Sequence, residues 1–284
     1  MFNKNKSMME TDKSKLDNGM IKDFFIILLI YFAGTILSGF LMGVLTPFFI
    51  NIKDTDLLLE GNNFEVIMKE NIDTFLIISL FLTLISTFVL YILARNYYKR
   101  SKESLGLKGE HRLRDYLIGA ALGIVSIGVI ALILQLSGNI EFTLSIENIS
   151  ISIFILYIIG WIFQGFNEEF LCRSILMNYY ASKKSITFAF IINSAIFSLL
   201  HLLNDGFSIL PSINIFLVGL IFSLSFYAFD NILMASGFHS FWNMAQANIF
   251  GISVSGIMRT ENTIFSSKNI GSDLLNGGEF GIEG

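Results

Sequence analysis

Two neighbouring glutamates, Glu168 and Glu169, are followed by Arg173 in a stretch of the chain that is otherwise apolar on both sides. A charged side chain at the centre of a membrane span costs about 2.5–3.5 kcal/mol on the insertion scale. Three ionisable groups within six residues therefore require an explanation. One interpretation is a short interfacial turn at the end of a span. The other is a buried functional site, which is the default hypothesis for ionisable groups inside a membrane.

Glu168 and His201 lie symmetrically about position 184.5, next to the pair Lys183-Lys184, which marks a turn between two apolar segments. In an antiparallel helix hairpin, residues equidistant from the turn lie at the same level. Each residue is about 16 positions from the turn, or roughly 24 Å along a helix that rises 1.5 Å per residue. The spacing therefore predicts a carboxylate opposite an imidazole within the bilayer.

Three apolar segments carry polar side chains at helical spacing. They are Gln164, Asn167 and Glu168 in the first; Asn193, Ser194, Ser198, His201 and Asn204 in the second; and Ser236, His239, Ser240, Asn243 and Gln246 in the third. A polar lining on three helices would be costly if it faced lipid. We therefore expect these side chains to converge on one cavity.

The two glutamates are expected to have different roles, because adjacent residues on a helix point about 100° apart. Glu169 and Arg173 have the i,i+4 spacing of an ion pair, which would neutralise both groups. This pairing leaves Glu168 free to act as a base that moves protons. His201 could share a water molecule with Glu168.

His239 and Asn243 are also i,i+4 neighbours and project from one face of a helix. Both side chains can donate hydrogen bonds to a developing oxyanion. Together with a base and a residue that orients water, they supply the parts needed to hydrolyse a peptide bond without a covalent intermediate.

Other interpretations of these residues remain. A single histidine on an apolar helix is usually structural, although two histidines on separate helices, each beside Ser or Asn, count against this. Zinc bound by Glu168, His201 and His239 is an alternative, but the sequence has no HExxH motif. The one cysteine, Cys172, lies inside the charged motif and is interpreted as a small packing residue.

The composition predicts an all-α, polytopic transmembrane helix bundle. The chain has 284 residues, of which 53% are hydrophobic and 15% charged, against roughly 25% charged in soluble domains. The net charge of −4 argues against nucleic-acid binding. Seven apolar segments are long enough to be spans. They are Phe24–Ile50, Thr74–Ala94, Tyr116–Ser137, Ile151 to about Tyr180, Ile186–Leu203, Ile213–Phe229 and Ile232–Phe250.

The small residues within these spans predict close helix contacts. One stripe is Gly34, Ser38, Gly39 and Gly43, and a GxxxG pattern joins Gly119 to Gly123. The loop over residues 51–73 is polar and is expected to hold a short amphipathic helix.

Positive charge predicts the orientation of the bundle. Residues 1–22, residues 95–115 and the turn at 183–184 carry five, seven and two Lys or Arg, whereas the alternate loops and the C-terminal stretch carry four. The positive-inside rule then places the N-terminus in the cytoplasm and the C-terminus outside. We expect a multi-pass protein of the plasma membrane whose residues 1–22 form a polar, disordered cytoplasmic tail.

Three short motifs occur in order along the chain: EExxxR at Glu168, Glu169 and Arg173, FxxxH at Phe197 and His201, and HxxxN at His239 and Asn243. This set resembles the CPBP family of intramembrane proteases, which includes CAAX proteases and bacteriocin-processing (Abi) proteins. The similarity covers about residues 116–284 and indicates a catalytic transmembrane domain there. It leaves residues 23–115 as an N-terminal region with two spans and a basic cytoplasmic loop.

The resemblance implies a membrane endopeptidase in which Glu168 and His201 activate water while His239 and Asn243 bind the oxyanion, with Glu169 and Arg173 in support. It favours a metal-free, glutamate-dependent site over a zinc site. The terminal GGEFGIEG resembles the loop before a last, eighth helix in relatives, so the chain is expected to be truncated after Gly284.

The expected partners are the lipid bilayer and a membrane-associated protein or peptide substrate. That substrate could be a prenylated CAAX protein, a bacteriocin precursor or a signalling membrane protein. A non-catalytic immunity or scaffold protein that binds partners through the same polar cavity is the main alternative. A proton-coupled transporter is a third, weakened because the halves of the chain show no internal repeat.

Overall fold

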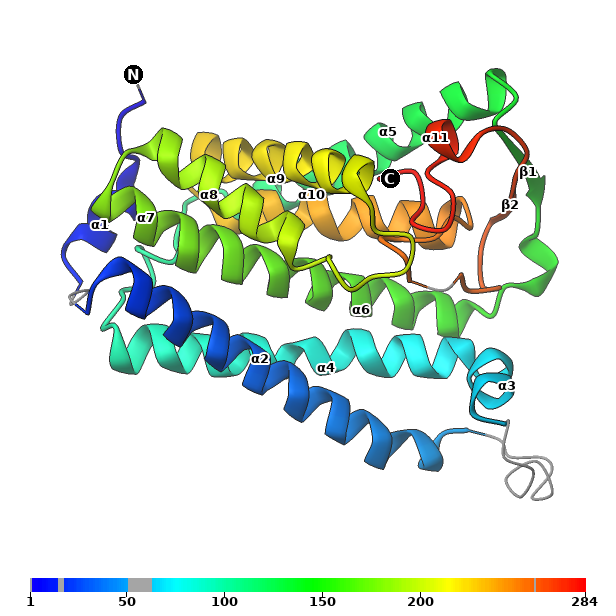
Figure 1. Ribbon diagram of the computed structural model, residues 1–284, viewed down its shortest axis with the longest axis horizontal. Helices are drawn as coiled ribbons and strands as arrows, with labels where there is room; N and C mark the ends of the chain where they lie inside the picture. Colours follow the sequence, from blue (N-terminus) through cyan, green and yellow to red (C-terminus); the bar gives the residue numbers. More distant parts are fainter. Residues whose placement is uncertain (1, 15–17, 51–62, 258) are drawn as a thin grey trace.

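The computed structural model describes residues 2–14, 18–50, 63–257 and 259–284, and these form a bundle of long helices with one short two-stranded sheet at one end (Figure 1). The long helices are α2 (Met20–Leu45), α4 (Ile72–Ile92), α5 (Arg112–Leu136), α6 (Ile151–Glu169), α8 (Ile186–Leu199), α9 (Ile209–Phe229) and α10 (Ile232–Met244). The shorter helices are α1 (Lys6–Asp12), α3 (Asn63–Glu70), α7 (Asn178–Lys183) and α11 (Asp273–Asn276). The predicted all-α class is confirmed.

Each of the seven predicted spans coincides with a helix. Five of the described helical segments are long and apolar enough to cross a membrane: Met20–Phe48, Ile72–Tyr97, Arg112–Leu136, Ile151–Lys183 and Ile209–Phe229. Helix α8 has only 14 residues, which cover about 21 Å of a hydrocarbon core that is roughly 30 Å thick. A polytopic helical bundle is therefore established, and seven crossings stay a prediction.

Helix α8 ends at Leu199, four residues before the predicted end of that span at Leu203. The cause lies in the side chain of His201. Its Nδ1 hydrogen-bonds to the carbonyl oxygen of Phe197 at 2.8 Å, while its backbone N–H donates to the carbonyl oxygen of Ser198 at 3.1 Å. A side chain that takes a helical carbonyl competes with the backbone ladder, so the helix stops here.

The expectation of a disordered tail over residues 1–22 is wrong for the part of the tail that is described. Residues 6–12 form α1, which Asn5 caps by accepting the N–H of Met8. The Met8 side chain is fully buried, and the backbone N–H of Ser7 bonds to the Asp230 carboxylate at 3.1 Å. The tail is thus docked onto the turn after α9.

Helix α10 approaches two neighbours so closely that only glycine fits at the contacts. A methyl group on Gly119 of α5 would lie 2.2 Å from the carbonyl oxygen of Met234, and one on Gly123 would lie 2.5 Å from that of Phe238. The predicted GxxxG contact is therefore confirmed. On α6, a methyl group on Gly165 would lie 2.4 Å from Ser240 Oγ. This contact sets the last turns of α6 beside α10.

Helix α2 is hydrogen-bonded to the bundle near its N-terminal end and diverges from α4 toward its C-terminal end. Asp23 is fully buried and accepts the hydroxyls of Tyr98 at 2.9 Å and Tyr179 at 2.8 Å. Further along, a methyl group on Gly34 would lie 2.7 Å from Ser86 Cα of α4. Beyond this crossing α2 slopes away from α4 (Figure 1).

Only half of the predicted small-residue stripe of α2 makes the expected close contact. Gly34 lies against α4, and Ser38 bonds to the carbonyl of Leu82 at 2.9 Å. Among the described residues, no atom of another element lies within 4 Å of a methyl group placed on Gly39 or Gly43. The stripe loses contact because α2 diverges, which a residue pattern on one helix does not encode.

The C-terminal stretch folds back over one end of the bundle. Strand β2 (Phe265–Asn269) pairs antiparallel with β1 (Ile140–Leu144), with Ile140 opposite Asn269. Glu283 is buried and accepts Trp242 Nε1 of α10 at 2.7 Å. Residues 251–257 and 259–284 therefore fold as a cap over this end of the bundle.

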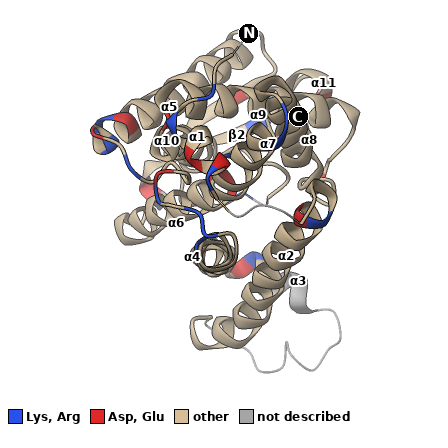
Figure 2. Ribbon diagram, turned by 90° about the vertical axis from the view of Figure 1, so that its left-hand side faces the viewer, with Lys and Arg blue, Asp and Glu red and all other residues tan. Residues whose placement is uncertain are grey.

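The predicted inner and outer segments lie at opposite ends of the bundle. Helices α1 and α7 share one end, and the sheet, α3 and α11 lie at the other (Figure 1). Seen from the α1 end, the charged residues colour mainly loops and helix ends, and the long helices are mostly uncharged (Figure 2). The predicted amphipathic helix of the polar loop corresponds to α3, and residues 51–62 of that loop lie outside the described residues.

Candidate active site

Glu168 and Glu169 are the last two residues of α6, where the helix widens. The chain continues without a break into the π-helical segment η5 (Phe170–Met177) and then α7. Short π-helical insertions occur frequently at functional sites. The close contact between Gly165 and Ser240 brings this widened stretch against α10, so both carboxylates face the neighbouring helix.

Glu169 and Arg173 form the predicted ion pair. Arg173 Nη1 lies 2.8 Å from Glu169 Oε1, and both side chains have no exposed surface. The second guanidinium nitrogen donates to the carbonyl of Gly219 on α9 at 2.8 Å. The guanidinium carbon also lies 4.6 Å from the ring centre of Phe197, which adds a cation–π contact. The pair therefore joins α6, η5, α8 and α9.

His239 of α10 contacts both glutamates. Its Nδ1 lies 2.9 Å from Glu169 Oε1, and its Nε2 lies 3.7 Å from Glu168 Oε2. The ring is stacked on Phe222, with centroids 4.8 Å apart and planes inclined by 17°. Because a carboxylate oxygen only accepts, the Nδ1 proton points at Glu169. The Glu169 contact was not predicted, since it joins residues 70 positions apart.

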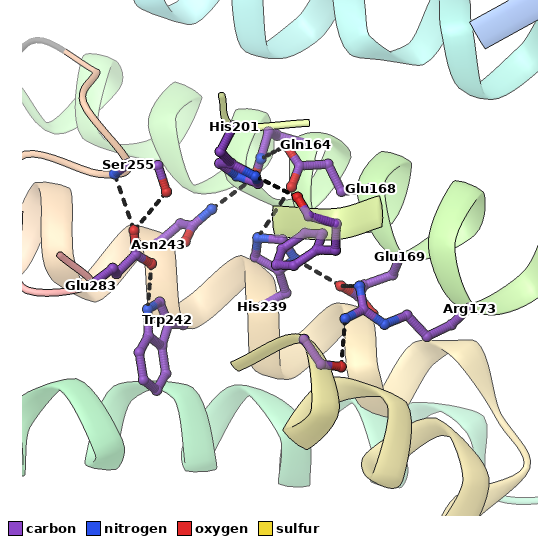
Figure 3. A network of polar contacts seen from close by, with 12 residues as sticks. Gln164, Glu168, Glu169, Arg173, His201, His239, Trp242, Asn243, Ser255 and Glu283 are labelled. Atoms are coloured by element: carbon purple, nitrogen blue, oxygen red, sulfur yellow. Dashed lines mark hydrogen bonds and ion pairs between the residues drawn. The ribbon is translucent and has the colours of Figure 1, made fainter. Parts of the chain in front are cut away.

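His201 follows the end of α8, and its ring points toward Gln164 and Glu168 (Figure 3). Since its Nδ1 bonds to a carbonyl oxygen, which only accepts, the proton of the neutral ring sits on Nδ1. Its Nε2 is then a free acceptor. The centroid of the Phe197 ring lies 5.0 Å from that of the His201 ring and 5.8 Å from that of the His239 ring, so Phe197 lies between the two imidazoles.

Gln164 links Glu168 to Asn243. Its Nε2 donates to Glu168 Oε1 at 2.6 Å, and its Oε1 accepts Asn243 Nδ2 at 3.0 Å. The other oxygen of Glu168, Oε2, makes no hydrogen bond to the described residues. His201, His239 and Asn243 are buried, whereas the Glu168 side chain keeps 21% of its surface exposed.

The exposed part of Glu168 faces a cavity of about 240 Å³ between α2, α4 and α6. Tyr31 and Gly39 of α2, Thr83 of α4, and Asn167 line it together with Glu168. The cavity lies where α2 diverges from the bundle. A ligand that entered it would meet the Glu168 carboxylate.

The structure brings together all six predicted site residues: Glu168, Glu169, Arg173, His201, His239 and Asn243 (Figure 3). Other members of the polar stripes make structural bonds elsewhere. Asn193 donates to Ser223 of α9, and Asn204 and Gln246 donate to backbone carbonyls of the C-terminal stretch. The expectation that all these side chains line one cavity is therefore wrong.

Sequence reasoning placed Gln164 in the polar lining but gave it no specific role. Its i,i+4 spacing to Glu168 on α6 was the signal that could have found the contact. Within the described residues, no group of three His, Cys, Asp or Glu side chains is arranged to hold a metal ion. The zinc alternative through Glu168, His201 and His239 therefore has no support from this geometry, and metal dependence stays a prediction.

Comparison with known proteins identifies one segment. Residues 150–245, about a third of the chain, match the family described as type II CAAX prenyl endopeptidase Rce1-like. This segment runs from the start of α6 to the end of α10 and holds all six site residues. The predicted resemblance to CAAX-type intramembrane proteases is confirmed for it. No match was found among curated proteins or among solved structures.

Proposed function

With an Rce1-like type II CAAX prenyl endopeptidase segment at its centre, we propose that this chain is an intramembrane endopeptidase that hydrolyses peptide bonds of a membrane-associated protein or peptide. The attacking water is activated by Glu168. The observation that carries the proposal is the convergence of Glu168, His201, His239 and Asn243 at one largely buried place, from three separate parts of the chain.

Charge balance assigns a second proton to His239. Glu168, Glu169 and Arg173 together carry one net negative charge, and an uncompensated charge in a low-dielectric site is costly. A cationic His239 makes the group neutral and lets Nδ1–H and Nε2–H face one glutamate each, at 2.9 and 3.7 Å. Its Nε2–H is then a donor for the carbonyl oxygen of a bound peptide.

Glu168 and His201 provide two acceptors for one water molecule. Glu168 Oε1 is engaged by Gln164, so Oε2 is the oxygen that removes the proton. His201 Nε2 accepts the other hydrogen of the water and directs the lone pair of its oxygen at the peptide carbonyl. Attack forms a tetrahedral intermediate whose oxyanion takes hydrogen bonds from His239 and Asn243. Glu168 then passes the proton to the leaving amine, which breaks the C–N bond.

The cavity between α2, α4 and α6 is the route by which substrate reaches Glu168 in this proposal. It lies beside the contact between α2 and α4, and Glu168 forms part of its wall. A membrane-associated substrate would approach from this side, because the remaining site residues are buried within the bundle.

The decisive experiment incubates detergent-purified protein with three synthetic peptides. One ends in an S-farnesylated CAAX sequence, one is the same peptide without the farnesyl group, and one is an apolar membrane-span peptide. Products are identified by mass spectrometry, with the Glu168→Gln variant as control. Cleavage of any peptide by the wild type but not by the variant supports the proposal.

Three other outcomes would count against the proposal. Binding of a peptide without cleavage would favour the non-catalytic immunity or scaffold protein. Peptide cleavage at full rate by Glu168→Gln protein would remove the assigned base and the mechanism. Proton flux across proteoliposomes in the absence of cleavage would favour the transporter.

A further inference from the structure

Among the described residues, Gln164 bonds both to the proposed base and to a proposed oxyanion donor. It lies on α6, one turn before Glu168, and is largely buried at 9% exposure. Its amide spans the gap between Glu168 Oε1, at 2.6 Å, and Asn243 Nδ2, at 3.0 Å (Figure 3). The three residues thus form one continuous hydrogen-bonded chain across the interface of α6 and α10.

The direction of every hydrogen bond in this chain is fixed by the Glu168 carboxylate. An ionised carboxylate only accepts, so Gln164 must turn its amide nitrogen toward it. The Gln164 oxygen then faces Asn243, and because this oxygen also only accepts, Asn243 must present its NH₂ group. One Asn243 N–H is used in this bond, and no other hydrogen bond of that nitrogen occurs within the described chain. The second N–H is left for a ligand.

Loss of the Gln164 amide would affect both ends of the chain. Asn243 could rotate by 180° and present Oδ1, which repels an oxyanion, in place of its N–H. Glu168 would lose the bond that holds Oε1 and leaves Oε2 facing His239. Both changes act on groups that touch the reacting atoms, whereas Gln164 itself is directed at protein side chains.

We propose that Gln164 is a positioning residue, which sets the amide of Asn243 as an oxyanion donor and aims the free oxygen of Glu168 at the attacking water. This inference rests on the proposed endopeptidase function. It assigns a role to a position that the three short motifs do not contain, since Gln164 precedes the first glutamate by four residues.

The first test replaces Gln164 by methionine, which has a similar length and no hydrogen-bonding amide. We expect kcat to fall roughly 10- to 100-fold, because misplacement of a catalytic group by about 1 Å can cost that much. KM for the cleaved peptide should change less than about two-fold, since both groups act in the transition state. Gln164→Glu is a second variant, of nearly the same shape. It still accepts from Asn243 but repels Glu168, so kcat should also fall.

A double-mutant cycle separates positioning from a merely structural role. Asn243→Ala alone should lower kcat by roughly 10²–10³-fold, the cost of one oxyanion donor. In the Asn243→Ala background, Gln164→Met should lower kcat by a smaller factor than it does in the wild type. The part of its effect that acts on Glu168 is the part that remains. A structural role predicts instead that the two effects multiply in full.

Gln246→Met is the matched control. Gln246 is a fully buried glutamine on the same helical segment as Asn243, and its Nε2 donates to the backbone carbonyl of Ser253. Its replacement should lower the melting temperature but leave kcat of the folded protein unchanged. The effects of Gln246→Met and Asn243→Ala on kcat should multiply in full in the double variant.

The melting temperatures of the wild type, Gln164→Met, Asn243→Ala and the double variant test the bond between Gln164 and Asn243 without an activity measurement. Coupling between Gln164→Met and Asn243→Ala in melting temperature is expected, because each removes one partner of a single bond. Wild-type kcat in Gln164→Met protein, or fully multiplicative effects in the cycle, would overturn the inference and leave the proposed function intact. Absence of cleavage by the wild type would instead overturn the proposed function, and with it the catalytic role of Gln164.

Discussion

Glu169→Gln is the substitution for which the structure predicts a stability effect distinct from a catalytic one. Glu169 Oε1 accepts from Arg173 at 2.8 Å and from His239 at 2.9 Å, with no exposed surface on the Glu169 side chain. Glutamine keeps an oxygen at that place but removes the charge. Arg173 would then be a buried cation that contacts a neutral amide oxygen, the Gly219 carbonyl and two aromatic rings, with no ionised partner at position 169.

The magnitude follows from the cost of an unpaired buried charge. Removal of one partner of a buried pair costs about 3–5 kcal/mol, and the retained oxygen places this case near 3 kcal/mol. A loss of 1 kcal/mol lowers Tm by roughly 2–4 °C in a chain of a few hundred residues, so we expect a decrease of roughly 6–12 °C. Glu168→Gln should lower Tm less than Glu169→Gln does, because Glu168 is partly exposed and the nearby His239 can release its second proton, while turnover falls roughly 10²–10⁴-fold.

The assay records Tm by fluorescence and cleavage of one peptide on the same detergent-purified samples. Arg173→Met in the Glu169→Gln background should recover much of the lost Tm, since the double variant no longer holds the unpaired buried cation. A Glu169→Gln protein that melts like the wild type but has lost turnover would refute this division of roles between the two glutamates.

Three further outcomes are expected. Gly39→Leu should slow cleavage at least ten-fold, in line with a misplaced or excluded substrate, whereas Gly43→Leu should not. Both glycines face open space, but only Gly39 lines the cavity beside Glu168. Equal cleavage rates in the two variants would exclude this route for the substrate. Strong chelators should leave turnover intact, and activity lost with a chelator and restored by zinc would favour a metal site. Lys108→Cys should resist an impermeant thiol reagent in intact cells, and Glu147→Cys should react with it. Both positions are exposed, they belong to loops at opposite ends of the bundle, and the native Cys172 is buried. The reverse labelling pattern would invert the topology.

Local patterns along the chain predicted the helices and much of the site. The hairpin symmetry about Lys183-Lys184 brought Glu168 and His201 to one place because α6, η5, α7 and α8 follow each other with only a short turn. The i,i+4 spacing of Glu169 and Arg173 predicted their ion pair for the same reason. These inferences depend on helix geometry alone, which sequence spacing encodes.

Contacts between distant segments were not predictable in this way. The bond between His239 and Glu169 depends on the crossing of α6 and α10, and the docking of α1 depends on partners more than 200 residues away. Asn204 turned from the site because His201 ended α8 early with its own side chain. A polar composition alone indicated disorder at the N-terminus, although the buried residues Ser7, Met8 and Thr11 contribute to fixing it in place.

The docked N-terminal helix also constrains the order of biosynthesis. The Asp230 carboxylate that accepts the N–H of Ser7 is translated 223 residues after Ser7 itself. At roughly 5–20 residues per second, α1 waits about 10–45 s for that partner. The helices α2 to α8 are therefore inserted while this end of the bundle is still open. A nascent chain arrested before Asp230 would lack the acceptor for the Ser7 N–H.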